Sequence, residues 1–244
     1  MARPIAIIFA LDIEAEGVVS RLSDVDVTPG DSFRVTNGAL AGADVVVVSS
    51  GPGARQAHSA TSELISRHQP VWVISAGFSG GLVPAVRRGD VVMADSVADE
   101  RQNVLSIDLR LDGTDKTAGL HVGRVLSVAR VVVAPNEKQQ LGESHSALAV
   151  DLESFAVAEV CAQEKVRFLA VRVVSDPVEQ RLPDEVRILL AKNTAAGRWG
   201  AVAGSVMRRP SSLRDLWTLR ENAINSSDRL GQFLEGVVTQ LAEI

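Results

Sequence analysis

Several ingredients are scarce in this sequence, and each scarcity excludes a class of protein. The 244 residues include 1 cysteine, Cys161, so no disulfide can form within the chain. Tyrosine is absent and aromatic residues make up only 4%, which leaves few rings on which single-stranded nucleic acid could stack. The formal net charge is -5, so the chain offers no broad attraction to a phosphate backbone. We therefore expect no nucleic-acid partner.

The sequence also shows no pattern typical of a targeting segment or of a membrane-spanning helix. No apolar run approaches the ~18 residues of a membrane-spanning helix. Acidic residues appear at Asp12, Glu14 and Glu16, before any long apolar stretch or small-residue cleavage site, which is not the pattern of a signal peptide. A reducing, cytoplasmic location is the expectation that follows.

The composition that remains is typical of a globular domain, with 46% hydrophobic and 23% charged residues. Because a hydrophobic core stops growing near ~250–300 residues, we expect one domain over residues 1–244. Short runs rich in valine and isoleucine alternate with helical patterns, and such runs suit strands buried on both faces. We predict strands at residues 4–10, 44–49, 71–76, 89–94, 123–126 with 131–134, 147–150 and 168–174, and helices at 14–22, 54–67 and 152–163. The alternation predicts an α/β fold with a largely parallel sheet covered on both sides.

The last part of the chain, residues 208–244, has a different character. After the break at Pro210, apolar residues recur at steps of three and four, which predicts a C-terminal extension of one or two amphipathic helices. Such helices ordinarily pack on the sheet or on a partner subunit. The alternative is a peripheral membrane contact, with anionic lipid bound by Arg208, Arg209, Arg214 and Arg220.

Two glycine-rich segments follow predicted strands. Gly51 and Gly53 lie between a strand and a helix, and residues 77–81 (GFSGG) follow the next strand. Glycine lets a ligand approach the backbone closely, and a helix start presents free N–H groups. The first segment is not a dinucleotide fingerprint, because Gln56 stands where the third glycine is required. We expect a polar-ligand site here, at the C-terminal ends of the strands.

Three carboxylates, Glu14, Glu153 and Asp176, lie next to predicted strand ends. A buried acid that is not paired has a raised pKa, and this suits a general acid at neutral pH. Taken singly, each could instead be a helix cap or a surface charge. Arg172 lies four residues before Asp176 on the same strand, so strand alternation places both side chains on one face, where the arginine could neutralise an acid. The four histidines show no metal-ligand spacing, and we expect no metal.

Six segments, taken in order, resemble those of the purine nucleoside phosphorylase superfamily. They are residues 9–16 (FALDIEAE), 50–53 (SGPG), 75–82 (SAGFSGGL), 89–92 (GDVV), 150–154 (VDLES) and 171–176 (VRVVSD). The methylthioadenosine/S-adenosylhomocysteine nucleosidases look like the nearest branch, whereas the chain from Leu189 onward is more similar to hopanoid-associated phosphorylase-like proteins. The resemblance implies a three-layer α/β/α sandwich with a mixed, mostly parallel sheet. It also implies a homodimer that cleaves the N-glycosidic bond of purine nucleosides with no cofactor and no metal.

The resemblance further implies roles for individual residues. Asp176 looks like the acid that protonates N7 of the purine. Glu14 resembles the carboxylate that deprotonates the attacking water, and Arg172 would orient Glu14 and that water. The implied substrate-binding positions are Glu153 and Leu152 at the ribose hydroxyls, Ser175 beside Asp176, Gly77 and Phe78 beneath the sugar, and Ser79.

Two departures from the nucleosidase pattern leave alternatives open. Phe78 stands where these enzymes commonly carry serine, and residues 126–133, with Val131 near the usual purine-stacking phenylalanine, match poorly. Hydrolysis of a 5′-substituted adenosine is favoured, because Glu14 would repel phosphate and Ser75 stands where trimeric and hexameric phosphorylases carry an arginine. The alternatives are a phosphorylase, which could act on a lipid-linked adenosyl substrate, and a non-catalytic nucleoside-binding protein.

Overall fold

The computed structural model describes residues 3–29, 33–108, 117–182 and 212–243, with the side chains of residues 212–220 outside the description. Its strands are β1 (Ile5–Phe9), β2 (Ser23–Pro29), β3 (Arg34–Leu40), β4 (Ala43–Ser49), β5 (Trp72–Gly81), β6 (Val91–Asp99), β7 (Val104–Ser106), β8 (Leu120–Ser127), β9 (Ala149–Asp151) and β10 (Arg167–Asp176). Its helices are α1 (Asp12–Val19), α2 (Ala54–His68), α3 (Pro135–His145), α4 (Ser154–Glu164) and α7 (Ser212–Ala242).

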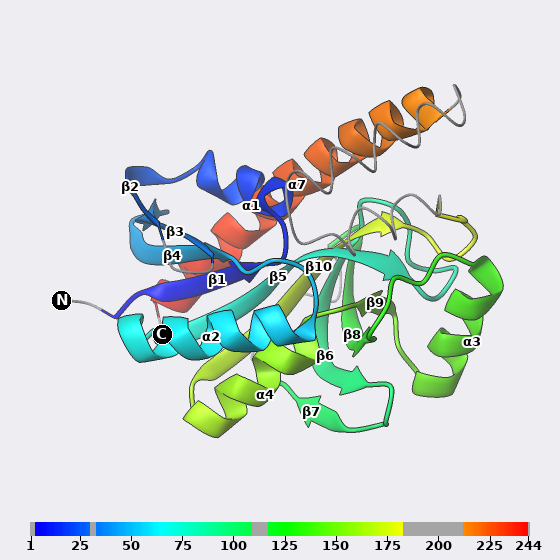
Figure 1. Ribbon diagram of the computed structural model, residues 1–244, viewed down its shortest axis with the longest axis horizontal. Coiled ribbons are helices and arrows are strands. Elements are labelled where there is room, and N and C mark those ends of the chain that lie inside the picture. The colour runs from blue at the N-terminus through cyan, green and yellow to red at the C-terminus, as the bar shows by residue number, and fades with distance from the viewer. Residues whose placement is uncertain (1–2, 30–32, 109–116, 183–211, 244) are drawn as a thin grey trace.

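One 10-stranded sheet organises the described residues. The strand order is β10-β6-β8-β9-β5-β1-β4-β3-β2, with β7 beside β6, and β10 also pairs with β5. This last pairing closes β5, β10, β6, β8 and β9 into a ring. The neighbours β4, β1, β5 and β10 are all parallel, whereas β2 and β3 form an antiparallel edge. Helices α1 and α7 cover one face of the sheet and α2 and α4 the other (Figure 1), which confirms the predicted α/β fold with a mixed sheet.

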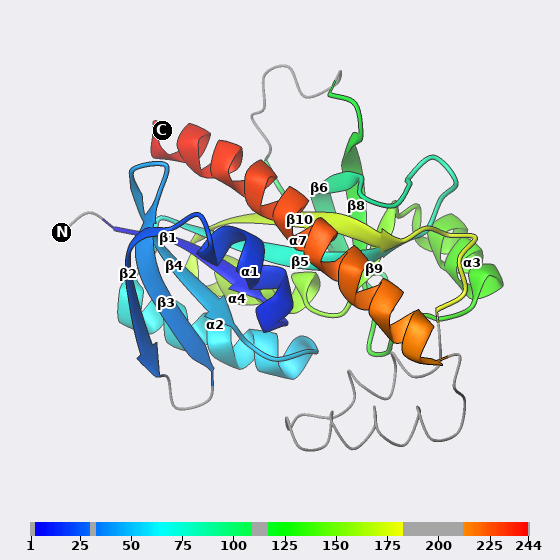
Figure 2. The same cartoon turned by 90° about the horizontal axis from the view of Figure 1, so that it is seen from above.

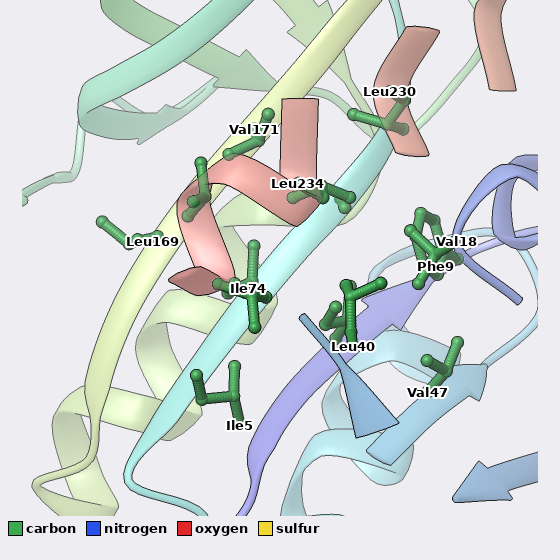
Figure 3. Close-up of a cluster of buried hydrophobic side chains, with 14 of the residues drawn as sticks. Ile5, Phe9, Val18, Leu40, Val47, Ile74, Leu169, Val171, Leu230 and Leu234 are labelled. Atoms are coloured by element: carbon green, nitrogen blue, oxygen red, sulfur yellow. The ribbon is translucent and has the colours of Figure 1, made fainter. Parts of the chain in front are cut away.

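The hydrophobic core lies on both faces of the sheet because its central strands are buried on both faces. Toward α1 and α7, a cluster joins strand residues such as Ile74 and Val171 to Val18 of α1 and to Leu230 and Leu234 of α7 (Figure 3). On the other face, Ala6 and Val73 pack against Leu64 of α2 and Val157 of α4. Burial of a large aliphatic side chain contributes about 1.5–3 kcal/mol, so these two clusters hold the helices to the sheet.

Several observed strands extend the predicted ones, whereas β1 and β9 are shorter and residues 131–134, predicted as strand, form none. The structure also adds elements that the hydrophobic pattern missed. The glycine-rich residues 77–81 continue β5 as strand rather than forming a loop. Strands β2 and β3 and helix α3 were not predicted, so the antiparallel share of the sheet is larger than expected. The expected one or two C-terminal helices form a single helix of 31 residues, α7, which crosses the sheet over β10 and β5 (Figure 2).

The predicted lipid contact of this C-terminal region falls on residues that are not described. Arg208 and Arg209 lie outside the described ranges, as do the side chains of Arg214 and Arg220. The described part of α7 packs into the core through Leu230, Leu234, Val237 and Val238. None of the helices in the described ranges combines the length and the apolar character that crossing a membrane requires.

Close contact between α1 and α7 depends on two glycines. A Cβ added at Gly231 would lie 2.3 Å from the carbonyl oxygen of Gly17, and one added at Gly17 would lie 1.9 Å from that of Ser227. The Gly17 N–H donates to Ser227 Oγ at 2.8 Å, and Ser227 Oγ donates to the Glu14 carbonyl at 3.2 Å. The C-terminal helix therefore holds the helix that carries Glu14.

The variant Gly231→Ala is expected to lower the free energy of unfolding by about 1–3 kcal/mol, because its methyl group forces the two backbones apart. Gly236 lies on the same helix with nothing within 4 Å of an added Cβ. Gly236→Ala should therefore stabilise the protein by about 0.5–1 kcal/mol through helix propensity alone. Urea denaturation measures both changes, and equal effects at the two positions would contradict the packing interpretation.

Candidate active site

Glu14 is buried at the start of α1, 5% exposed, and its carboxylate accepts backbone N–H groups from two elements. Oε2 accepts from Leu11 at 2.8 Å and from Ala10 at 3.1 Å, and Oε1 accepts from the Phe78 N–H at 2.8 Å. The hydrogen bond from the Leu11 N–H is the one that a glutamate at the third helix position makes in a capping box. Glu14 therefore also caps α1, which is the other role that its position in the sequence allowed. Burial raises the pKa of Glu14, opposed by the bonds from Phe78, Leu11 and Ala10 and by the charge of Arg172.

Glu153 precedes α4 and joins it to the first glycine segment. Its Oε1 accepts the Gly53 N–H at 2.7 Å, and its Oε2 accepts the Leu152 N–H at 3.3 Å. Gly53 has φ +99°, a left-handed conformation that favours glycine, so the loop can turn its N–H toward the acid. Burial is the largest of the effects that raise the pKa of Glu153 to about 8, and the negative charges of Asp151 and Glu14 add to it. Glu14 therefore lies close enough to Glu153 for its charge to act on the pKa of that acid.

Asp176 ends β10 and is 4% exposed. Its Oδ1 accepts a hydrogen bond from Ser175 Oγ at 2.6 Å, and its Oδ2 accepts one from Lys138 Nζ at 2.5 Å. Burial raises the pKa of Asp176, while the ammonium group of Lys138 opposes the rise. Beside it, a Cβ at Gly80 would lie 3.2 Å from both Asp176 Oδ2 and Val150 Cγ1. Val150 belongs to an apolar cluster with Leu126 and Val132, which therefore flanks the acid.

Strand β5 contacts two of these acids. A Cβ at Gly77 would lie 2.9 Å from Glu14 Oε1, and one at Gly80 would lie 3.2 Å from Asp176 Oδ2. The two glycines are three residues apart, so their Cα atoms are separated by about 10 Å along the strand. Glu14 and Asp176 therefore both lie against the C-terminal half of β5. The glycine segment thus serves close approach, although it is strand and not loop.

Arg172 forms an ion pair with an acid, but this acid is Asp151 and not one of the three candidate acids. A register shift between Val174 and Asp176 breaks the same-face argument. Arg172 Nε donates to Asp151 Oδ2 at 2.6 Å and Nη2 donates to Ser75 Oγ at 2.7 Å. The positive charge of Arg172 nevertheless acts on Glu14 and Glu153 at longer range, and it lowers the pKa of both.

The remaining predicted positions surround the same strand. Phe78 is half-buried and contributes its backbone N–H to Glu14. Ser79 Oγ donates to the Val173 carbonyl at 3.4 Å, and Ser175 Oγ lies 3.2 Å from the Ser79 carbonyl. Leu152 packs against the apolar cluster next to Asp176. In the described ranges, no three His, Cys, Asp or Glu side chains gather as a metal-ligand group.

Two important residues were missed. Asp151 directly follows the predicted strand at residues 147–150, and this position was the signal that could have identified it. Lys138 lies on α3, whose polar sequence carries no clear apolar period. Pro135 at the first turn of α3, where proline is favoured, was a signal of a helix start that could have found it.

The stability contribution of Glu153 should depend on pH. Its folded pKa of about 8 lies above the ordinary 4.5, so between these values the folded state holds a proton that the unfolded state has lost. This contribution is present below pH 4.5 and is lost as pH rises to about 8. In urea denaturation, the advantage of wild type over Glu153→Gln should fall with pH by as much as ~1.4 kcal/mol per unit. Glu159→Gln, at an exposed position of the same helix, should show no such slope, and equal slopes would contradict the assignment.

Comparison with known protein families identifies the family of this chain. A profile described as the phosphorylase superfamily matches residues 4–198. The chain belongs to the phosphorylase superfamily. This confirms the family that the six sequence segments resemble.

Individual members of the superfamily show how widely the likeness extends. A 5′-methylthioadenosine/S-adenosylhomocysteine nucleosidase of Tolumonas auensis is 28% identical over 219 residues, covering 79% of this chain and 95% of that protein. The solved nucleosidase of Neisseria meningitidis, in complex with methylthio-immucillin-A, superposes with a TM-score of 0.70 at 21% identity, covering 96% of this chain and 100% of that one. The Helicobacter pylori nucleosidase, with butyl-thio-DADMe-Immucillin-A, reaches 0.75 at 18% identity, covering 98% and 99%. The solved structures establish the shared superfamily fold.

Proposed function

We propose that this chain is a nucleosidase that hydrolyses the N-glycosidic bond of a 5′-substituted adenosine. The observation that carries the proposal is that the buried acids Glu14 and Asp176 both lie against glycines of β5, while the charge of Glu14 raises the pKa of Glu153. The names of the curated relatives, which are nucleosidases for 5′-methylthioadenosine and S-adenosylhomocysteine, support the same substrate class.

Acidic groups suit the charges that develop in this reaction. Breaking the bond between the sugar and its base leaves positive charge on the ribose and an electron pair on the base. Asp176 gives its proton to N7 of the departing base. Glu14 takes a proton from water, and the hydroxide oxygen bonds to the sugar carbon that the base leaves. One water is consumed, and a free base and a free sugar are released.

The neighbouring residues hold the substrate and set the charge. Glu153, next to Glu14, accepts hydrogen bonds from the ribose hydroxyls, with Gly77 and Phe78 beneath the sugar. Ser175 orients Asp176 through its 2.6 Å bond. Arg172 acts at longer range, because its charge lowers the pKa of Glu14 and so favours the form that accepts a proton from water.

Water is preferred over phosphate as the nucleophile because the sugar end is acidic. The Glu14 carboxylate would repel a phosphate dianion. Ser75, the position at which the resemblance places a phosphate-binding arginine, instead accepts the bond from Arg172 at 2.7 Å. The charge of Arg172 is itself matched by Asp151.

The test is incubation with 5′-methylthioadenosine and S-adenosylhomocysteine in phosphate-free buffer, with free adenine measured by chromatography. Release without phosphate supports hydrolysis. Release that requires added phosphate would identify a phosphorylase, and tight binding of both nucleosides with no turnover would identify a binding protein. We also expect a homodimer, as the family resemblance implies, and light scattering on the eluted protein measures its mass.

A further inference from the structure

Lys138 is a buried ammonium group that the proposed reaction does not yet use. Its side chain has 0% exposure, on helix α3. Nζ donates to Asp176 Oδ2 at 2.5 Å, to the Gln180 carbonyl at 3.0 Å and to the Pro177 carbonyl at 3.1 Å. An ammonium group has three N–H donors, and here each has an acceptor. The surroundings are therefore built for the charged form of the lysine.

Stability alone does not account for this pair. Burying two charges costs desolvation energy that their attraction repays only in part, and apolar replacements of such pairs are often neutral or stabilising. The position of the pair is more informative, since it lies where β5, β10 and α3 meet, at the end of the site proposed to receive the base. The partner of Lys138 is the group proposed to deliver a proton to that base.

The charge on Lys138 changes the protonation of Asp176 in one direction. Burial favours the neutral carboxylic acid, and an ammonium group in hydrogen-bond contact favours the carboxylate. Arg88, from the segment between β5 and β6, adds a weaker effect of the same sign, and its own side chain bonds to Gln180 Oε1. Ser175 is uncharged and donates to the opposite oxygen of Asp176.

We propose that Lys138 is a positioning residue that holds Asp176 as an oriented carboxylate in the empty site, so that Asp176 must take a proton from solvent before it can give one to the base. The inference rests on the proposed function. The added proton binds the carboxylate, passes to N7 as the bond to the sugar breaks, and leaves Asp176 again paired with Lys138. This arrangement makes the reaction of this chain more sensitive to rising pH than the same acid without a buried cation.

The experiment compares the pH dependence of kcat/KM for wild type, Lys138→Met and Lys165→Met. Asp176 must be protonated to act, so kcat/KM falls as pH rises through the pKa of Asp176. Removing the cation raises this pKa, so in Lys138→Met the fall should move to higher pH by at least ~1 unit, a tenfold change in proton affinity. Lys165→Met removes the same charge from an exposed position after α4 and should leave the midpoint unchanged.

A titration that needs no substrate separates this inference from the proposed function. Carbon-13 NMR of the Asp176 carboxyl gives its midpoint in the free protein, and we expect it to be higher in Lys138→Met than in wild type. If Lys138→Met does not fold, Lys138→Gln removes the charge and keeps one N–H donor for Asp176. An unchanged midpoint in the NMR titration, or a lower kcat/KM at every pH with no shift, would overturn the role of Lys138. Adenine release by wild type tests the proposed function separately.

Discussion

Replacing Asp176 with asparagine is expected to lower kcat for adenine release by about 10²–10⁴-fold, the usual contribution of a positioned general acid. Asparagine keeps the shape and can accept the bond from Lys138, but it has no acidic proton for N7. Single-turnover measurement with 5′-methylthioadenosine reports the chemical step directly. KM should change much less than kcat, because the lost interaction belongs to the transition state.

A matched control is Asp228→Asn. Asp228 forms an exposed ion pair with Arg21 at 2.7 Å, on the helix that packs against α1, and such pairs contribute about 0–1 kcal/mol. This variant should retain the wild-type rate. If Asp176→Asn also releases adenine at the wild-type rate, Asp176 is not the acid and the base must leave by another route.

Arg172→Met is expected to lower the free energy of unfolding by about 3–5 kcal/mol, because it leaves the buried carboxylate of Asp151 without its cation. Arg172 is 2% exposed and Asp151 6% exposed, so water cannot readily take over the lost bonds. The Ser75 hydroxyl also loses its partner. Urea denaturation near neutral pH measures the loss, provided that the slope of the transition is unchanged.

Arg167→Met serves as the comparison on the same strand. Arg167 is exposed and lies over the ring of Trp72 at 5.3 Å, a contact that contributes about 0.5–1 kcal/mol at such a site. Its replacement should therefore cost far less than that of Arg172. A loss at Arg172 no larger than the loss at Arg167 would mean that Asp151 finds another partner or becomes protonated at little cost.

The parts of the fold that the sequence predicted are those with a continuous apolar pattern. Strands β1, β4 and β10 are buried on both faces, so nearly every position requires an apolar side chain and the sequence shows a continuous run of valine and isoleucine. Strand β2 lies at the sheet edge with Val25 and Val27 exposed, and its alternation with aspartate does not distinguish it from a loop. The end of β5 was predicted as a loop because of its glycines. Gly77 and Gly80 instead make room for Glu14 and Asp176, which come from distant parts of the sequence.

The candidate site divides in the same way. The three acids follow strand ends, and the parallel strands β1 and β10 end at the same edge of the sheet. Strand β9, which precedes Glu153, is antiparallel to β5, so strand direction alone does not bring Glu153 to that edge. Their partners could not be predicted, because Lys138 is 38 residues from Asp176 and Asp151 is 21 residues from Arg172. The choice of partner depends on how β9, β10 and α3 pack, and on a single register shift in β10.

The contact between α1 and α7 has a consequence for the order of events during synthesis. The helix that carries Glu14 is made early, but the Ser227 hydroxyl that accepts a hydrogen bond from its Gly17 N–H is made 210 residues later. A growing polypeptide therefore lacks the support of α7 for α1 until synthesis has passed Ser227 and Gly231. All the described strands, through β10, have been made by then, so a nascent chain can pair its sheet while the apolar face that α7 covers is still open to other contacts.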